Sequence, residues 1–194
     1  DVNLKNVTTI SATSFEGSNL VNVIMPSYNF ATNKTITKAT LKPGSLKTLD
    51  MSGTPYMKDV HPYEGMSLAG YTNLTEVTVK NGVVLGPESF KGCTALNKVT
   101  GYVVLGGYGA FEECSSLEAI SIDEVATTKI FAYTFNEATS LVDVFNKDGK
   151  TPIKPTVIED CAFRKTKVNV DLTATTSIGT SAFAYNTGLM GKEI

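Results

Sequence analysis

The fold of this 194-residue chain is decided in residues 107–122, which read GYGAFEECSSLEAISI. A small residue, Ala110, precedes a large apolar one, Phe111, and Leu117 then opens the pattern L-x-x-I-x-I. The end of that pattern alternates apolar and polar residues with a period of two, which is typical of a half-buried strand. This short unit therefore combines a compact apolar anchor with a strand.

The small–large pair of this unit recurs along the chain. Successive pairs are separated by 20 to 28 residues, which lies in or near the period of leucine-rich repeats. We call the large residues the anchors and the unit around each one a coil. The anchors are Phe15, Leu41, Leu68, Phe90, Phe111, Phe135, Phe163 and Phe183.

Two further positions repeat in phase with the anchors. A leucine or valine stands five or six residues after each anchor and opens the first strand, as in 74–79, where Val77 and Val79 should point inward and Thr78 outward. A second extended piece, such as 83–85 or 157–158, ends five residues before the next anchor. Each coil is therefore predicted to contain two short strands.

Glycines follow the second extended piece in several coils, at Gly86, Gly107 and Gly179. We expect them to permit a tight or left-handed turn, after which a single helical turn carries the anchor into the core. Because one coil cannot bury its apolar edge alone, the coils have to stack.

The predicted fold class is a repeat solenoid of the leucine-rich-repeat type, α/β or mainly β, with short parallel strands and short helical turns. We expect one domain over residues 1–194, with about eight irregular coils of 20–28 residues. Eight strands would form a parallel ribbon roughly 35–40 Å long. A β-propeller would need four strands per ~40-residue blade, which this chain does not supply.

Residues 107–122 and residues 178–183, which read IGTSAF, resemble the I-G-x-x-A-F-x-x-C-x-x-L-x-x-I-x-I repeat of the BspA-like leucine-rich-repeat family. The resemblance extends over about residues 5 to 194, and the coils of Phe15, Leu41 and Phe163 depart from the pattern. It implies a protein that host-associated bacteria export to the cell surface or secrete, and that is often credited with adhesion. The family has no shared catalytic residue, so the resemblance implies a location and a class but no site.

Composition excludes several partners. With 17 basic and 19 acidic residues the formal net charge is -2, so we expect no binding to nucleic acid. No run of about 18 apolar residues is present, so we expect no membrane insertion by this segment. Because the chain begins with Asp1 and not with Met, we expect that an export signal was removed, which suits an extracellular or outer-surface location.

The three cysteines lack the spacing of a zinc or redox site. Cys93 and Cys114 each follow an anchor by three residues, so they should lie on adjacent coils, close enough for a disulfide. The preferred interpretation is a buried ladder of small residues, since free cysteine is commonly buried.

Nothing in the sequence indicates catalysis. His61 is the one histidine, and neither a G-x-S-x-G nor an H-E-x-x-H motif is present. Adjacent acids such as Glu112 and Glu113 suit solvated turns better than the facing pair of a glycosidase. We therefore predict a protein that is not an enzyme, with no cofactor and no metal; an enzyme with a loop-borne site is the remote alternative.

Two sets of residues are candidates for binding. The first is the outward row of the strand ribbon, in which Ile24 and Phe145 could form an apolar contact patch. That row comprises Asn22, Ile24, Thr48, Asp50, Glu76, Thr78, Lys98, Thr100, Ala119, Ser121, Asp143 and Phe145. The second set lies in three longer coils, where insertions often form functional loops. Those are 26–39 with Tyr28 and Phe30, 52–66 with Tyr56 and Tyr63, and 145–156 with Lys147, Lys150 and Lys154.

The first hypothesis is a non-catalytic surface or secreted module that recognises a host or microbial surface protein, or a glycan. Its ligand-binding candidates are Tyr28, Phe30, Tyr56, Glu76, Lys98, Asp143 and Phe145. The alternative is a structural spacer or capping segment of a larger surface protein, which would self-associate through its end coils. An evenly polar ribbon would favour the spacer, and an exposed apolar or aromatic patch the binder.

Overall fold

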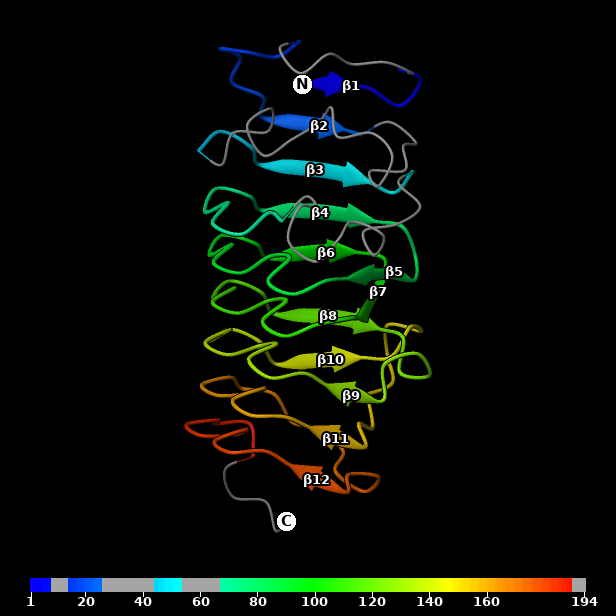
Figure 1. Ribbon diagram of the computed structural model, residues 1–194, viewed down its shortest axis with the longest axis vertical. Coiled ribbons are helices and arrows are strands. Elements are labelled where there is room, and N and C mark those ends of the chain that lie inside the picture. Colours follow the sequence, from blue (N-terminus) through cyan, green and yellow to red (C-terminus); the bar gives the residue numbers. More distant parts are fainter. Residues whose placement is uncertain (8–13, 26–43, 54–66, 190–194) are drawn as a thin grey trace.

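The computed structural model describes residues 1–7, 14–25, 44–53 and 67–189. Figure 1 shows a single column in which the strands are stacked one above another along the long axis, with the first and last labelled strands, β1 and β12, at opposite ends. The strands pair in parallel throughout the described sheets. The predicted leucine-rich-repeat solenoid is therefore confirmed.

The first ribbon is a five-stranded parallel sheet. Its strands, in spatial order, are β1 (Val2–Asn3), β2 (Asn22–Ile24), β3 (Thr48–Met51), β4 (Glu76–Val79) and β6 (Lys98–Thr100). β8 (Ala119–Ile122) follows in the column and pairs with β10 (Asp143–Phe145). In β4, Val77 and Val79 are buried and Thr78 is partly exposed, as the alternation predicts.

The second extended pieces form further sheets. β5 (Val83–Leu85) pairs in register with β7 (Tyr102–Leu105), and β7 also pairs with β8. β9 (Lys129–Ile130), β11 (Val157–Ile158) and β12 (Ser177–Ile178) make a three-stranded sheet. The predicted second strands at 83–85 and 157–158 are thus present.

The anchors form the centre of the core as an aromatic ladder. Adjacent rings have centroids 5.4–5.8 Å apart and planes within 8–14° of parallel. Stacked rings at such offsets contribute beyond their buried area. The ladder consists of Phe90, Phe111, Phe135, Phe163 and Phe183. The first four are fully buried, whereas Phe183 is partly exposed; Phe15 packs against the core, and Leu41 lies outside the described residues.

The expected helical turn at the anchors is wrong for the described coils, which have consecutive tight turns there. The residues two before and two after the anchor have positive φ, as at Tyr133 (58°) and Glu137 (60°) around Phe135. The N–H groups of Tyr133 and Phe135 each donate to a carbonyl of the next coil at 2.9 Å, and the N–H group of Glu137 does so at 3.0 Å. Hydrogen bonds between coils therefore satisfy backbone groups that a helix would satisfy internally.

The glycines after the second strand have another role than expected. Gly86, Gly107 and Gly179 do not adopt left-handed φ. A Cβ on Gly107 would lie 2.6 Å from Cγ of Pro87, and a Cβ on Gly179 would lie 2.5 Å from the backbone N of Asp160. Glycine at 107 and 179 thus permits close approach of neighbouring coils.

Cys93 and Cys114 are fully buried thiols on adjacent coils. Their Sγ atoms donate to the carbonyls of Leu68 and Phe90, both at 3.1 Å. Burial, followed by the neighbouring Cys93, raises the pKa of the Cys114 thiol. The position three residues after the anchor is also buried in later coils, so the structure has the buried ladder that was the preferred interpretation. Its later members are Ala138, Thr166 and Asn186.

Candidate binding surfaces

A groove of about 460 Å³ crosses the outward face of β1 to β4. Six of the twelve residues predicted for the outward row line it, because their side chains occupy the two outward positions of neighbouring strands. They are Asn22, Ile24, Thr48, Asp50, Glu76 and Thr78. We call this surface the ribbon groove.

Hydrogen bonds between side chains fix one end of the ribbon groove. Asn22 Nδ2 donates to Asp1 Oδ1 at 2.5 Å, and Thr48 Oγ1 donates to Asn22 Oδ1 at 2.8 Å. Next in the same row, Glu76 pairs with Lys98 at 3.1 Å, and both side chains are at least half exposed. Such a surface ion pair contributes little stability, so both groups can exchange partners.

The ribbon groove is acidic. Asp1, Asp50 and Glu76 line it, and none of the described lining residues is basic. Lys98, from the predicted candidate set, lies beside Glu76 at the edge of the groove. The groove therefore presents carboxylates and hydroxyls around one exposed apolar side chain, that of Ile24, which is 36% exposed.

The expected apolar patch of Ile24 and Phe145 is wrong. The two residues lie on β2 and β10, and strands β3, β4, β6 and β8 stand between them (Figure 1). Phe145 is also half-buried and bridges to Pro152. Asp143 is exposed on β10, outside the ribbon groove.

The aromatic candidates of the longer coils, Tyr28, Phe30 and Tyr56, lie outside the described residues, as do Tyr63 and His61. Their role in binding stays a prediction.

In the third long coil, acidic partners hold two of the lysines. Lys147 pairs with Asp123 at 3.5 Å and Lys154 with Asp171 at 3.1 Å. Asp148 accepts hydrogen bonds from the backbone N–H groups two and three residues later, at 2.7 and 2.8 Å. The backbone and hydroxyl hydrogen bonds of Thr151, followed by the backbone bond of Lys150, lower the pKa of Asp148. The coil is thus held by ion pairs to its neighbours and by hydrogen bonds within its own turn at Asp148.

A second depression, of about 620 Å³, lies over the turns around the anchors. The two tyrosines that line it, Tyr108 and Tyr133, are 41% and 42% exposed. Residues from four successive coils line it: Glu88, Lys91, Gly107, Tyr108, Glu112, Phe131, Ala132, Tyr133 and Glu159. We call it the aromatic depression.

Sequence analysis missed the aromatic depression. Its aromatic residues occupy positions two, three and four before an anchor. At each of these positions no other coil carries an aromatic residue, so they produce no periodic signal. The available signal was the local excess of aromatic residues at 108, 131 and 133 in two consecutive coils.

Ion pairs lie on two sides of the aromatic depression, one set around Lys91 and the other around Lys129. Lys91 Nζ lies 3.0 Å from Glu112 and 3.1 Å from Glu88, and the hydrogen bonds to Glu112 and then Glu88 raise the pKa of Lys91. On the other side, Lys129 lies 2.8 Å from Glu159 and 4.3 Å above the centre of the Phe131 ring. Hydrogen bonds from Lys129 and from the Ala132 backbone lower the pKa of Glu159.

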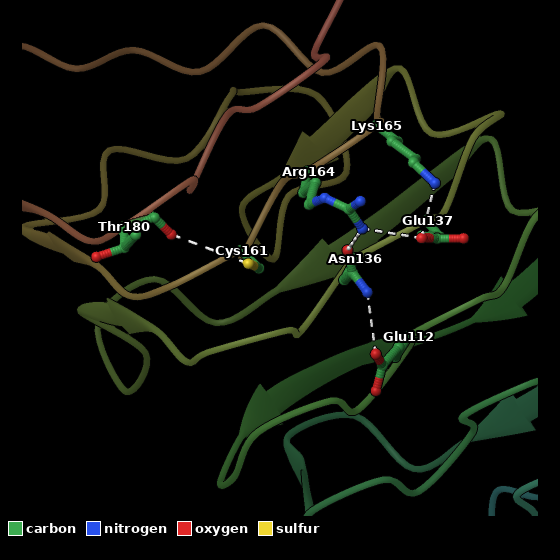
Figure 2. A network of polar contacts seen from close by, with 7 residues as sticks. All are labelled: Glu112, Asn136, Glu137, Cys161, Arg164, Lys165 and Thr180. Atoms are coloured by element: carbon green, nitrogen blue, oxygen red, sulfur yellow. Dashed lines mark hydrogen bonds and ion pairs between the residues drawn. The ribbon is translucent and has the colours of Figure 1, made fainter.

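A network of hydrogen bonds connects Glu112, which lines the aromatic depression, to later coils (Figure 2). Asn136 Nδ2 donates to Glu112 at 3.0 Å, and Asn136 Oδ1 accepts from Arg164 Nη1 at 3.3 Å. Glu137 then accepts from Arg164 at 2.9 Å and from Lys165 at 2.8 Å. The Glu112 carboxylate is therefore held in place from both sides.

The described part of the chain offers no group of three or more histidine, cysteine, aspartate or glutamate side chains arranged for a metal ion. Within those same residues, no helix is long and apolar enough to cross a membrane.

The stacked coils, the inward anchor ladder and the outward ribbon define a leucine-rich-repeat protein. Six copies of the BspA type leucine rich repeat region match residues 65–190, and the chain belongs to that family. The matched residues contain the six anchors from Leu68 to Phe183, including the Phe163 coil. The match is thus shorter than the expected 5–194, and six copies match where about eight coils were expected.

One solved structure supports the fold. A leucine rich cell surface protein from Faecalibacterium prausnitzii A2-165 superposes with a TM-score of 0.50 at 20% identity, over 86% of this chain. The match spans only 40% of that protein's length. A search of curated protein sequences gives no significant match.

Proposed function

We propose that this chain is a non-catalytic recognition module, displayed on a bacterial cell surface or secreted, that binds a protein or glycan through the ribbon groove. The observation that carries the proposal is the groove itself, in which the outward rows of four parallel strands converge on one surface. Solenoids commonly bind along such a surface. Membership in the BspA-type family and the cell-surface description of the similar structure support the location.

The chemistry of the ribbon groove favours a protein partner over an acidic glycan. Three carboxylates line the groove, so a segment with lysine or arginine side chains would find complementary charge. The exposed Ile24 adds an apolar contact among these polar groups.

The proposal is tested by screening the purified chain against arrayed matrix proteins and glycans. The test variant is Thr78→Arg, which places a long cation in the groove beside Asp50, its cross-strand neighbour. The matched control is Thr100→Arg, which occupies the same row on β6 outside the groove lining. Saturable binding that Thr78→Arg weakens at least tenfold, and Thr100→Arg much less, supports the proposal.

A parallel variant with Tyr28, Phe30 and Tyr56 changed to alanine tests the long coils. Loss of binding in this variant alone moves the recognition surface to those coils. No saturable binding by a well-folded chain contradicts the recognition function.

A structural segment of a larger surface protein is the second candidate. It is favoured by β12, where Ser177 and Ile178 are both exposed and Ile178 is 51% exposed. An exposed apolar strand edge can pair with another chain. Sedimentation of the chain and of Ile178→Lys tests this candidate: concentration-dependent association lost in the variant supports it, and a monomer at all concentrations contradicts it.

A further inference from the structure

The aromatic depression is a separate surface from the ribbon groove. The two share no lining residue, because the groove lies on β1 to β4 and the depression lies over the turns around later anchors. The function proposed for the ribbon groove therefore does not predict which ligand the aromatic depression would bind.

Gly109 lies next to two residues that line the aromatic depression. Gly109 occupies the position two before its anchor, where the neighbouring coils carry Glu88 and Tyr133. A Cβ on Gly109 would lie 3.4 Å from Cγ of Glu88 and 3.4 Å from a carboxylate oxygen of Glu112, both of which line the depression. A side chain at this position would thus extend between the lining residues.

The aromatic depression combines aromatic side chains with paired charges. Tyr108 and Tyr133 are exposed within it, beside Phe131. The three lining carboxylates share two lysine partners, each within 3.1 Å, so the site is rich in hydrogen-bond donors and acceptors and keeps one formal negative charge, which disfavours acidic ligands. Its volume lies within the range of about 300–1,000 Å³ that is usual for small-molecule sites.

This chemistry discriminates between ligand classes. A cationic side chain would compete with Lys91 and Lys129 for carboxylates that are already paired. A wholly apolar ligand would remove water from these charged side chains without replacing the hydrogen bonds that water makes to them, which is costly. A sugar ring has an apolar face for the aromatic rings and hydroxyl groups that both donate to carboxylates and accept from lysines. We propose that the aromatic depression is a binding subsite for an uncharged sugar.

The test uses a panel of neutral and acidic oligosaccharides and one lysine-rich peptide, titrated to about 10 mM. Because the chain has no tryptophan, its tyrosine emission can be followed directly, and two of its eight tyrosines line the depression. Saturation-transfer NMR confirms contact with the sugar.

Two variants alter the depression and two serve as controls. Tyr133→Ala removes an exposed ring, and Gly109→Asn fills the space with a residue that tolerates the left-handed backbone of Gly109 (φ 62°). The controls are Gly92→Asn, at a left-handed glycine (φ 69°) outside the lining, and Tyr185→Ala, at a 78% exposed tyrosine elsewhere. Urea unfolding verifies that each variant is folded.

The expected result is saturable binding of at least one neutral oligosaccharide, with a dissociation constant that rises about tenfold or more in Tyr133→Ala and Gly109→Asn and less than twofold in the controls. Thr78→Arg should leave sugar binding unchanged, which separates this site from the ribbon groove. The proposal is overturned by the absence of neutral-sugar binding, by equal effects in the controls, or by binding of the peptide alone.

Discussion

Replacing Phe135 with alanine should destabilise the protein more than any comparable change at the end of the aromatic ladder. Phe135 is fully buried and stacks on Phe111 at 5.8 Å and on Phe163 at 5.5 Å. A buried Phe→Ala change costs about 3–5 kcal/mol in total, and that total includes the lost ring contacts of about 0.5–1.5 kcal/mol each. We expect a loss of about 4 kcal/mol.

Phe183→Ala is the matched control. Phe183 is partly exposed, and its one ring contact in the described ladder is to Phe163 at 5.4 Å. We expect about half the cost of Phe135→Ala, because less area and one contact are lost.

The assay is urea unfolding followed by circular dichroism. With a slope of about 2 kcal/mol per M, the midpoint should fall by about 2 M for Phe135→Ala and by about 1 M for Phe183→Ala. Because each coil contacts only its neighbours, the Phe135 variant should also unfold less cooperatively. Equal costs for the two variants, or a cost below about 1.5 kcal/mol for Phe135→Ala, would refute the ladder as the centre of stability.

Three further changes test local features of the fold. Gly107→Ala should cost about 2 kcal/mol or more, because its Cβ would lie 2.6 Å from Pro87. Gly86→Ala is the control: it stands at the same repeat position, its Cβ would have no atom within 4 Å, and it should be neutral or slightly stabilising. Matching urea midpoints for the two variants would contradict this expectation. Burial raises the pKa of Tyr71 from 10.0 to about 12, so the stability due to its neutral form is fully present below pH 10 and is lost as pH rises toward 12. In Tyr71→Phe the free energy of unfolding should fall less over this pH range, and an unchanged alkaline profile would contradict that expectation. A hydrogen bond from Lys165, followed by one from Arg164, lowers the pKa of Glu137 from 4.5, so the stability that this carboxylate contributes is present above pH 4.5 and is lost as pH falls. Glu137→Gln should cost under about 1 kcal/mol at pH 7 and progressively less as pH falls below 4.5, which unfolding over that pH range measures.

The strands and the anchors could be predicted because burial leaves a direct trace in the sequence. Val77 and Val79 alternate with Thr78, and each fully buried ring follows a small residue. The same alternation identified Asp50 and Glu76 as outward residues, which now line the ribbon groove.

The backbone of the anchor turns could not be predicted in this way. A helical turn and a pair of tight turns bury the same positions, the anchor and the residue three later, so the apolar pattern fits both. Positive φ at residues such as Glu113 (61°) and Tyr133 (58°) has no signal in composition, because hydrogen bonds to the next coil hold them there.

The aromatic depression was missed for a different reason. The depression depends on which side chains of successive coils lie beside one another. The pattern of a single repeat unit carries no information about these neighbours in other coils. Tyr108 and Tyr133 stand at different positions within their coils, so no search by phase would have joined them.

The central claim, recognition through the ribbon groove, is tested most directly by photo-crosslinking to a partner recovered from the array. A photoreactive residue replaces either Thr78, inside the groove, or Val142, which is 45% exposed and lies outside the groove lining. The account predicts a covalent adduct with the partner from position 78 and none from position 142. Equal adducts from both positions, or an adduct from position 142 alone, would contradict it.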